Sequence, residues 1–142
     1  MSVKSITRRD VVTVESDASA EDIGVLLETE GVGCVVVTST EAGEEQPVGI
    51  VTDRDLGLRV WNFEDPRAAT AAELMSEDLF VVDVDSELYP ALRDAAKRGI
   101  RRFPVVDDGA LYGIVTLDDV VVLLAGELAE VSNVIQGHAP PY

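Results

Sequence analysis

The chain has 142 residues, the size of one compact domain, and 46% of them are hydrophobic, which excludes wholesale disorder. With 11 Lys and Arg against 27 Asp and Glu, the formal net charge is −16, so the surface repels nucleic-acid backbones and anionic membranes. One cysteine and one histidine exclude an intrachain disulfide and are too few for a Cys/His zinc site.

The first ten residues are polar, and no apolar run is long enough to span a bilayer. We therefore expect a soluble cytoplasmic protein that binds no metal, nucleic acid or membrane. The only lysines are Lys4 and Lys97, and an acidic, lysine-poor surface suits solubility at high salt. The composition thus favours a halophilic source, the alternative being an ordinary acidic cytoplasmic protein.

The first half of the chain is predicted to fold in the order β-α-β-β-α. Ser19 and Asp22 have the spacing of a capping box at the start of the first helix, and Gly31 ends that helix. A Glu- and Gly-containing loop is expected between the second and third strands, and a linker follows the second helix. The three strands are expected at 11–14, 34–38 and 48–52, and the second helix at 53–60. The loop is expected at 39–47 and the linker at 61–72.

The second half is predicted to repeat this order. Ser86 is the expected cap of its first helix, where Pro90 is tolerated only near the helix start, and Gly99 ends that helix. The strands and the last helix are expected at 80–84, 103–106, 111–116 and 117–128.

The sequence itself shows the repeat. Residues 49–56 (GIVTDRDL) recur as residues 113–120 (GIVTLDDV) at an offset of 64, whereas Gly31 matches Gly99 at an offset of 68. The difference is an insertion in the first copy, within its predicted loop. One unit of about 60 residues buries too little apolar surface to be secure alone, so we expect the two units to pack sheet to sheet with pseudo-two-fold symmetry.

The twin units, each containing Gly-Ile-Val-Thr-x-x-Asp, resemble the CBS (cystathionine β-synthase) domain pair, or Bateman module, over about residues 3–128. This resemblance implies an α+β fold of two βαββα repeats, which we place at 1–66 and 67–130, followed by a C-terminal tail at 131–142. It implies a nucleotide-binding regulatory protein that takes AMP, ADP, ATP or S-adenosylmethionine in two symmetry-related clefts, with no obligatory cofactor. It also implies a homodimer.

The Thr-x-x-Asp motif suits a nucleotide. Thr52 and Thr116 each end a strand and open a helix, whose N-terminal amides and dipole attract phosphate. Asp55 and Asp119, one turn later, can accept hydrogen bonds from both ribose hydroxyls, as carboxylates do in dinucleotide-binding folds. The alternative is a capping box that serves only the helix. The two roles are partly compatible.

In the CBS family, the Thr and Asp of one repeat face the first strand and the pre-strand segment of the other repeat. The resemblance therefore implies a first cleft made of Ile50, Thr52, Asp55, Val82, Ile100, Arg101, Arg102, Phe103 and Pro104. It implies a second cleft made of Val12, Thr13, Val14, Gly33, Cys34, Val35, Ile114, Thr116 and Asp119. For the apolar members, the alternative is plain core packing.

The two clefts are expected to differ. Arg101 stands where relatives hold a His or Arg that contacts phosphate, whereas its counterpart in the first repeat is Gly33. Arg54 either reaches phosphate too or is a solvated arginine. Since Arg–phosphate contacts are strong, we expect the Asp55 cleft to prefer a phosphorylated nucleotide, with AMP favoured over polyphosphates by the acidic surface. The Asp119 cleft is expected to bind weakly, to bind adenosine-like ligands, or to stay empty.

No catalytic residue is expected. The chain has no Gly-x-Ser-x-Gly and no phosphate-binding Gly-Lys-Ser/Thr loop, and Cys34 lies in an apolar run typical of a core thiol. The sequence favours a ligand-binding module that signals to an unidentified partner chain. The main alternative is a structural or dimerisation module with vestigial clefts, in which the apolar stretch 120–124 either forms part of a homodimer interface or is buried within the chain.

Overall fold

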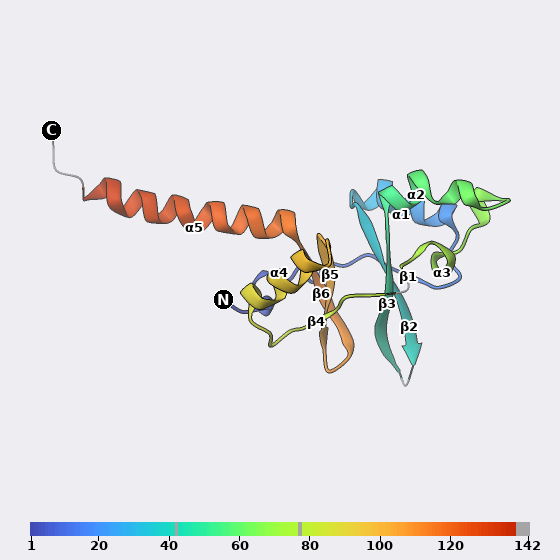
Figure 1. Cartoon of the computed structure of the whole chain (residues 1–142), viewed down its shortest axis with the longest axis horizontal. Helices are drawn as coiled ribbons and strands as arrows, with labels where there is room; N and C mark the ends of the chain where they lie inside the picture. The colour runs from blue at the N-terminus through green and yellow to red at the C-terminus, as the bar shows by residue number, and fades with distance from the viewer. Residues whose placement is uncertain (42, 77, 139–142) are drawn as a thin grey trace.

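Two three-stranded sheets form the centre of the molecule in the computed structural model, which describes residues 1–41, 43–76 and 78–138. In each sheet the first strand is parallel to the second, and the second is antiparallel to the third. Strand β3 lies against β5 and β6 of the other sheet, so the sheets pack face to face (Figure 1). The six strands are β1 (Thr13–Glu15), β2 (Cys34–Glu41), β3 (Glu44–Thr52), β4 (Val82–Asp83), β5 (Arg102–Asp107) and β6 (Ala110–Thr116).

Helices alternate with these strands in the same order in both halves, which confirms the predicted α+β fold of two βαββα units. The α-helices are α1 (Ala20–Glu30), α2 (Asp53–Leu58), α3 (Ala71–Leu74), α4 (Leu88–Lys97) and α5 (Leu117–Gly137). Short 3-10 turns occur at η1 (Val3–Ile6), η2 (Val60–Asn62) and η3 (Pro66–Ala68). The last two turns and α3 occupy much of the predicted linker.

Helix α1 makes one of the two bonds of its predicted capping box, whereas α4 lacks its predicted cap. The Ser19 side chain accepts a hydrogen bond from the Asp22 amide at 3.1 Å, and Gly31 adopts a left-handed φ of 64° after the last turn. In the second repeat the N-cap of α4 is Glu87, which makes no side-chain capping bond. Ser86 instead uses its backbone carbonyl to accept from the Val3 amide at 2.9 Å, so the predicted cap at Ser86 is wrong.

The insertion in the first repeat lengthens a hairpin. Strands β2 and β3 remain paired as far as Glu41 and Glu44, so the loop predicted at 39–47 is mostly strand. By contrast, β1 and β4 both begin two residues later than predicted, at Thr13 and Val82. Residues just before these strands, including Val12 and Phe80, line cavities instead.

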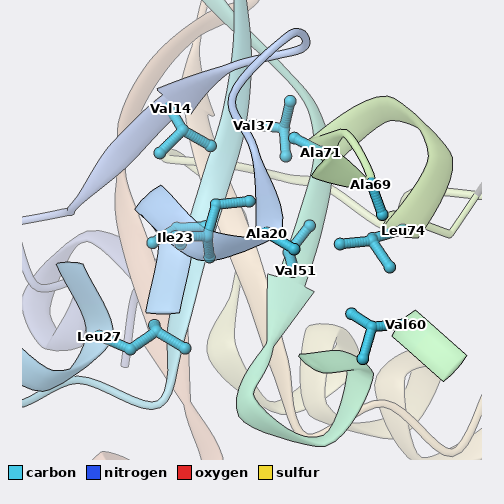
Figure 2. Close-up of a cluster of buried hydrophobic side chains, with 11 residues drawn as sticks. Val14, Ala20, Ile23, Leu27, Val37, Val51, Val60, Ala69, Ala71 and Leu74 are labelled. Atoms are coloured by element: carbon cyan, nitrogen blue, oxygen red, sulfur yellow. The ribbon is translucent and has the colours of Figure 1, made fainter. Parts of the chain in front are cut away.

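Each half has its own buried core, and each core contains a segment from outside its βαββα unit. Ala69, Ala71 and Leu74 pack with Ile23 and the other apolar side chains of the first cluster (Figure 2). Correspondingly, Val3 of η1 is fully buried in the second cluster. Backbone hydrogen bonds hold both segments, including Ala71 to Ala18 at 2.8 Å and Val3 to Ser86 at 2.9 Å. The segment before each unit therefore packs on the other unit.

Helix α5 is longer than predicted. It continues to Gly137, so the predicted helix end at Leu128 and irregular tail are wrong as far as that residue; residues 139–142 lie outside the described part of the chain. The helix extends away from both sheets (Figure 1). An 18-residue window of this 21-residue helix has a mean hydropathy of 1.4, so by length and composition alone the helix could cross a bilayer, contrary to the expectation that no segment could.

Candidate functional site

Each Thr-x-x-Asp motif caps the N-terminus of a helix, α2 in the first repeat and α5 in the second. Thr52 accepts from the Asp55 amide at 3.2 Å, while the Asp55 carboxylate accepts from the Thr52 amide at 2.9 Å and from its hydroxyl at 3.1 Å. In the second repeat, Thr116 accepts from the Asp119 amide at 3.2 Å and donates to the Asp119 carboxylate at 2.8 Å. The first motif therefore forms the complete capping box, whereas the Asp119 carboxylate accepts, among the described residues, only from the Thr116 hydroxyl, and the ligand role of both motifs stays a prediction.

A cavity of about 530 Å³ opens beside the first motif, and we call it the Asp55 cavity. It combines the end of β3 and the start of α2 with residues before β4 and between α4 and β5 of the other repeat. Its lining residues are Ile50, Thr52, Asp53, Arg54, Asp55, Ser76, Asp78, Leu79, Phe80, Gly99, Ile100, Arg101 and Arg102.

A second cavity of about 670 Å³, the Asp119 cavity, opens beside the second motif. It combines the end of β6 and the start of α5 with residues before β1 and between α1 and β2. Its lining residues are Arg8, Asp10, Val11, Val12, Glu30, Gly31, Val32, Gly33, Cys34, Asp53, Arg101, Arg102, Ile114, Thr116, Asp118 and Asp119.

The two cavities are built from equivalent positions of the two repeats. At the sequence offset of 68, the eight lining residues from Ser76 to Arg102 of the Asp55 cavity match eight lining residues of the Asp119 cavity. The second set is Arg8, Asp10, Val11, Val12, Gly31, Val32, Gly33 and Cys34. Each cavity thus pairs the Thr-x-x-Asp of one repeat with the residues that lead into the first two strands of the other repeat. We call these residues the entry segments; they are 8, 10–12 and 31–34 in the first repeat and 76, 78–80 and 99–102 in the second.

Thirteen of the nineteen predicted site residues line the two cavities. In the first cavity they are Ile50, Thr52, Arg54, Asp55, Ile100, Arg101 and Arg102, and in the second they are Val12, Gly33, Cys34, Ile114, Thr116 and Asp119, with one arginine pair shared by both.

 Cys34, which the sequence also predicted as a core thiol, is half-buried and lines the Asp119 cavity.

The other predicted site residues line neither cavity in the described part of the chain. Val82, Phe103 and Pro104 are buried in or beside the second core, and Val14 and Val35 belong to the first. Thr13 pairs with Val36 inside the sheet. The prediction extended the contacts into β1, β2, β4 and β5, whereas the cavities use the residues just before these four strands and the first residues of β2 and β5.

Sequence reasoning missed the members of these entry segments, as well as two carboxylates at the helix starts. The missed residues are Arg8, Asp10, Val11, Glu30, Gly31, Val32, Asp53, Ser76, Asp78, Leu79, Phe80, Gly99 and Asp118. The repeat alignment could have found most of them, because entry-segment residues of one cavity predict their counterparts in the other.

Arg8 is the most informative of the missed residues. Its backbone pairs with Ile114 of β6 through hydrogen bonds of 2.9 and 3.0 Å, so the entry segment crosses onto the second sheet. Its guanidinium lies 3.8 Å from the Asp119 carboxylate and 3.5 Å from that of Asp10. Its counterpart in the Asp55 cavity is Ser76. Among the described residues, Asp55 therefore has no arginine at the position equivalent to Arg8.

Arginines line both cavities, so the prediction that only the Asp55 cavity gains one is wrong. Arg101 and Arg102 lie where the two cavities meet, and they line both cavities. Because Gly33 has no side chain, it leaves room for the Arg102 guanidinium, which would lie 3.0 Å from a Cβ atom at this position. The cavities differ instead in carboxylates. Among the described residues, three arginines face three carboxylates in the Asp55 cavity and five in the Asp119 cavity.

Comparison with known proteins gives one consistent family. The family model described as "CBS domain" matches residues 3–57 and 71–126. An uncharacterized protein of Methanopyrus kandleri is 36% identical over 123 residues, which cover 85% of this chain and 61% of that protein. The CBS domain-containing protein YhcV of Bacillus subtilis is 32% identical over 123 residues, which cover 85% of this chain and 84% of YhcV. The chain thus spans about three fifths of the first relative.

Solved structures share the fold. The hexameric CBS-CP12 protein from bloom-forming cyanobacteria has a TM-score of 0.74 at 27% identity, covering 85% of this chain and 69% of that one. The CBS domain pair of protein MJ0100, solved in complex with 5′-methylthioadenosine and S-adenosylmethionine, has a TM-score of 0.76 at 23% identity, covering 89% of this chain and 98% of that one.

Proposed function

This chain belongs to the CBS domain family, and on that premise we propose that it binds an adenine nucleotide, with AMP favoured, and acts as a regulatory module. The observation that carries the proposal is the pair of equivalent cavities, each formed by a Thr-x-x-Asp from one repeat and entry segments from the other. Their volumes, about 530 and 670 Å³, fall within the range of small-molecule sites. An adenosine ligand of the kind bound by MJ0100 is consistent with both.

The Asp55 cavity offers a separate surface for each part of a nucleotide. Ile50, Leu79, Phe80 and Ile100 supply an apolar wall for the adenine ring. Arg54, Arg101 and Arg102 supply donors for phosphate, and such charge-assisted hydrogen bonds are strong.

Asp55 is suited to the ribose. Its side chain is 20% exposed, so a ligand can reach it. One carboxylate oxygen serves the Thr52 cap, and the other lies 3.7 Å from Arg59. Because an ionised carboxylate offers about four acceptor sites, it can keep the cap and still accept from the ribose hydroxyls.

The carboxylates make the two cavities electrostatically different. The Asp55 cavity, with equal numbers of arginines and carboxylates among its described residues, suits a nucleotide monophosphate. The Asp119 cavity has an excess of two carboxylates, which weakens anion binding and favours an uncharged or cationic adenosine ligand such as S-adenosylmethionine. We thus keep the predicted preference of the Asp55 cavity for phosphate, but the reason is its smaller number of carboxylates and not an arginine that the other cavity lacks.

Thermal unfolding tests the proposal directly. AMP, ADP, ATP and S-adenosylmethionine are added separately at low and high salt, because a ligand that binds only the folded protein raises its Tm. We expect AMP to raise Tm at least as much as ATP does. If none of the four shifts Tm at either salt concentration, the cavities are vestigial.

The second candidate function is a structural or dimerisation module, and the exposed apolar residues of α5 favour it. The two functions are compatible, since a homodimer can carry nucleotide sites. We propose a cytoplasmic homodimer whose ligand occupancy is read by a partner chain. For occupancy to be read, the ligand must bind one conformation more tightly than another.

A further inference from the structure

Helix α5 carries a long apolar surface that the chain does not cover. Val120 is buried against the second core, but beyond the first turns the helix packs on no described part of the protein. Leu128, Val131 and Ile135 have 70%, 56% and 66% of their surfaces exposed. Most helices in proteins are stabilised by packing of an apolar face, and large exposed apolar surfaces mark interaction sites.

The apolar residues follow a heptad repeat. From Leu117, exposed apolar residues recur at alternating steps of four and three residues, which is the spacing of d and a positions in a coiled coil. We call this row of residues the seam. The 21 residues of α5 span three heptads, and all six seam positions are apolar and exposed. The seam consists of Leu117, Val121, Leu124, Leu128, Val131 and Ile135.

We propose that α5 pairs in parallel with α5 of a second copy of this chain along this seam. A β-branched residue occupies two of the three a positions, Val121 and Ile135, while Leu occupies two of the three d positions; this combination favours parallel two-stranded coiled coils.

The charges agree with a parallel order. In a parallel pair, Glu127 at a g position faces Ser132 of the other copy, so no like charges meet there. In a fully overlapping antiparallel pair, Glu127 of one copy would meet Glu127 of the other near the middle of the helix. Repulsion between these carboxylates disfavours that order.

A membrane surface fits α5 less well. Helices that lie on membranes carry Lys or Arg on their polar face, which attract anionic lipid. From Leu117 to Gly137 the helix contains no Lys or Arg, and its charged residues are Asp118, Asp119, Glu127 and Glu130. A second copy of the same apolar seam therefore matches the helix better than lipid does.

Disulfide cross-linking of the full chain tests the pairing. In a Cys34→Ala background, Val131→Cys places one thiol in the seam, and Val122→Cys places one outside it as the matched control. Since Val122 is 72% exposed and Val131 is 56% exposed, random collisions would favour the control. We expect Val131→Cys to form covalent dimers about tenfold faster, because pairing raises the effective thiol concentration.

Adding Leu128→Glu to the Val131→Cys chain is expected to abolish this advantage, with circular dichroism reporting whether the βαββα body stays folded. Equal cross-linking rates for Val131→Cys and Val122→Cys would overturn the proposal. So would predominant mixed disulfides when Val121→Cys and Val131→Cys chains are combined, because that outcome indicates antiparallel helices. Sedimentation with phosphatidylcholine vesicles, together with no cross-linking advantage, would assign α5 to lipid instead.

Discussion

Gly113 shows how a single residue lets the two repeats join. A Cβ atom at this position would lie 2.2 Å from the Arg8 carbonyl oxygen and 2.4 Å from the Thr7 side chain. The entry segment can therefore cross β6 only where the strand has no side chain. Gly49 is the equivalent position in the first repeat, and a Cβ atom there would collide with Met75. The sequence identified both glycines as repeat positions but not the close approach that requires them.

We predict that Gly113→Ala destabilises the protein by about 1–3 kcal/mol, because a backbone atom must move to make room. Gly126→Ala is the matched control: no atom lies within 4 Å of its added Cβ, and α5 gains a better helix former. The control is expected to be neutral or to stabilise by up to about 1 kcal/mol. Urea unfolding measures both changes, and equal effects would contradict the close-approach explanation.

The site was only partly predictable at the residue scale. Thr52, Asp55, Thr116 and Asp119 were predicted because their motif recurs in both repeats, and each lines a cavity. Arg8 was missed because it lies upstream of the predicted strand and has no charged counterpart at Ser76. Its importance depends on a long-range crossing that local spacing does not show.

At the level of elements, the sequence predicted which strands and helices form but not how their ends are used. Periodicity and capping signals predict local structure, and the βαββα order is correct in both repeats. The late starts of β1 and β4 and the packing of η1 and α3 on the opposite cores arise from contacts between distant segments. Neither hydrophobic pattern nor turn chemistry contains that information.

Because the segment before each unit packs on the other unit, α3 is expected to stabilise the first core, although it precedes the second unit. Leu74 is fully buried there, so Leu74→Ala should cost about 2–5 kcal/mol of unfolding free energy. Leu58→Ala is the control, because Leu58 is 63% exposed and its truncation should change stability by only about 0.5 kcal/mol. Chemical denaturation compares the two, and a Leu74→Ala protein as stable as Leu58→Ala would show that α3 contributes little to this core.

Over the whole molecule, the net charge of −16 opposes folding through self-repulsion. Salt screens this repulsion, with a Debye length of about 10 Å at 0.1 M and about 3 Å at 1 M. We therefore predict that Tm of the ligand-free protein rises steadily as KCl increases to molar concentrations, as the proposed halophilic origin requires. Differential scanning calorimetry measures this dependence, and a falling or constant Tm would contradict it.

The central claim, that the paired cavities hold an adenine nucleotide, is tested most directly by isothermal titration calorimetry with AMP. Asp55→Ala should weaken binding about 10-fold or more, because a charged hydrogen-bond acceptor for the ribose is lost. Glu73→Ala is the control, since Glu73 caps Thr70 in α3 through the same kind of contacts, at 3.1 and 3.0 Å, but lines neither cavity. We expect Glu73→Ala to bind AMP like the parent chain. Equal affinities for AMP in the parent and in a chain carrying both Asp55→Ala and Asp119→Ala would contradict it.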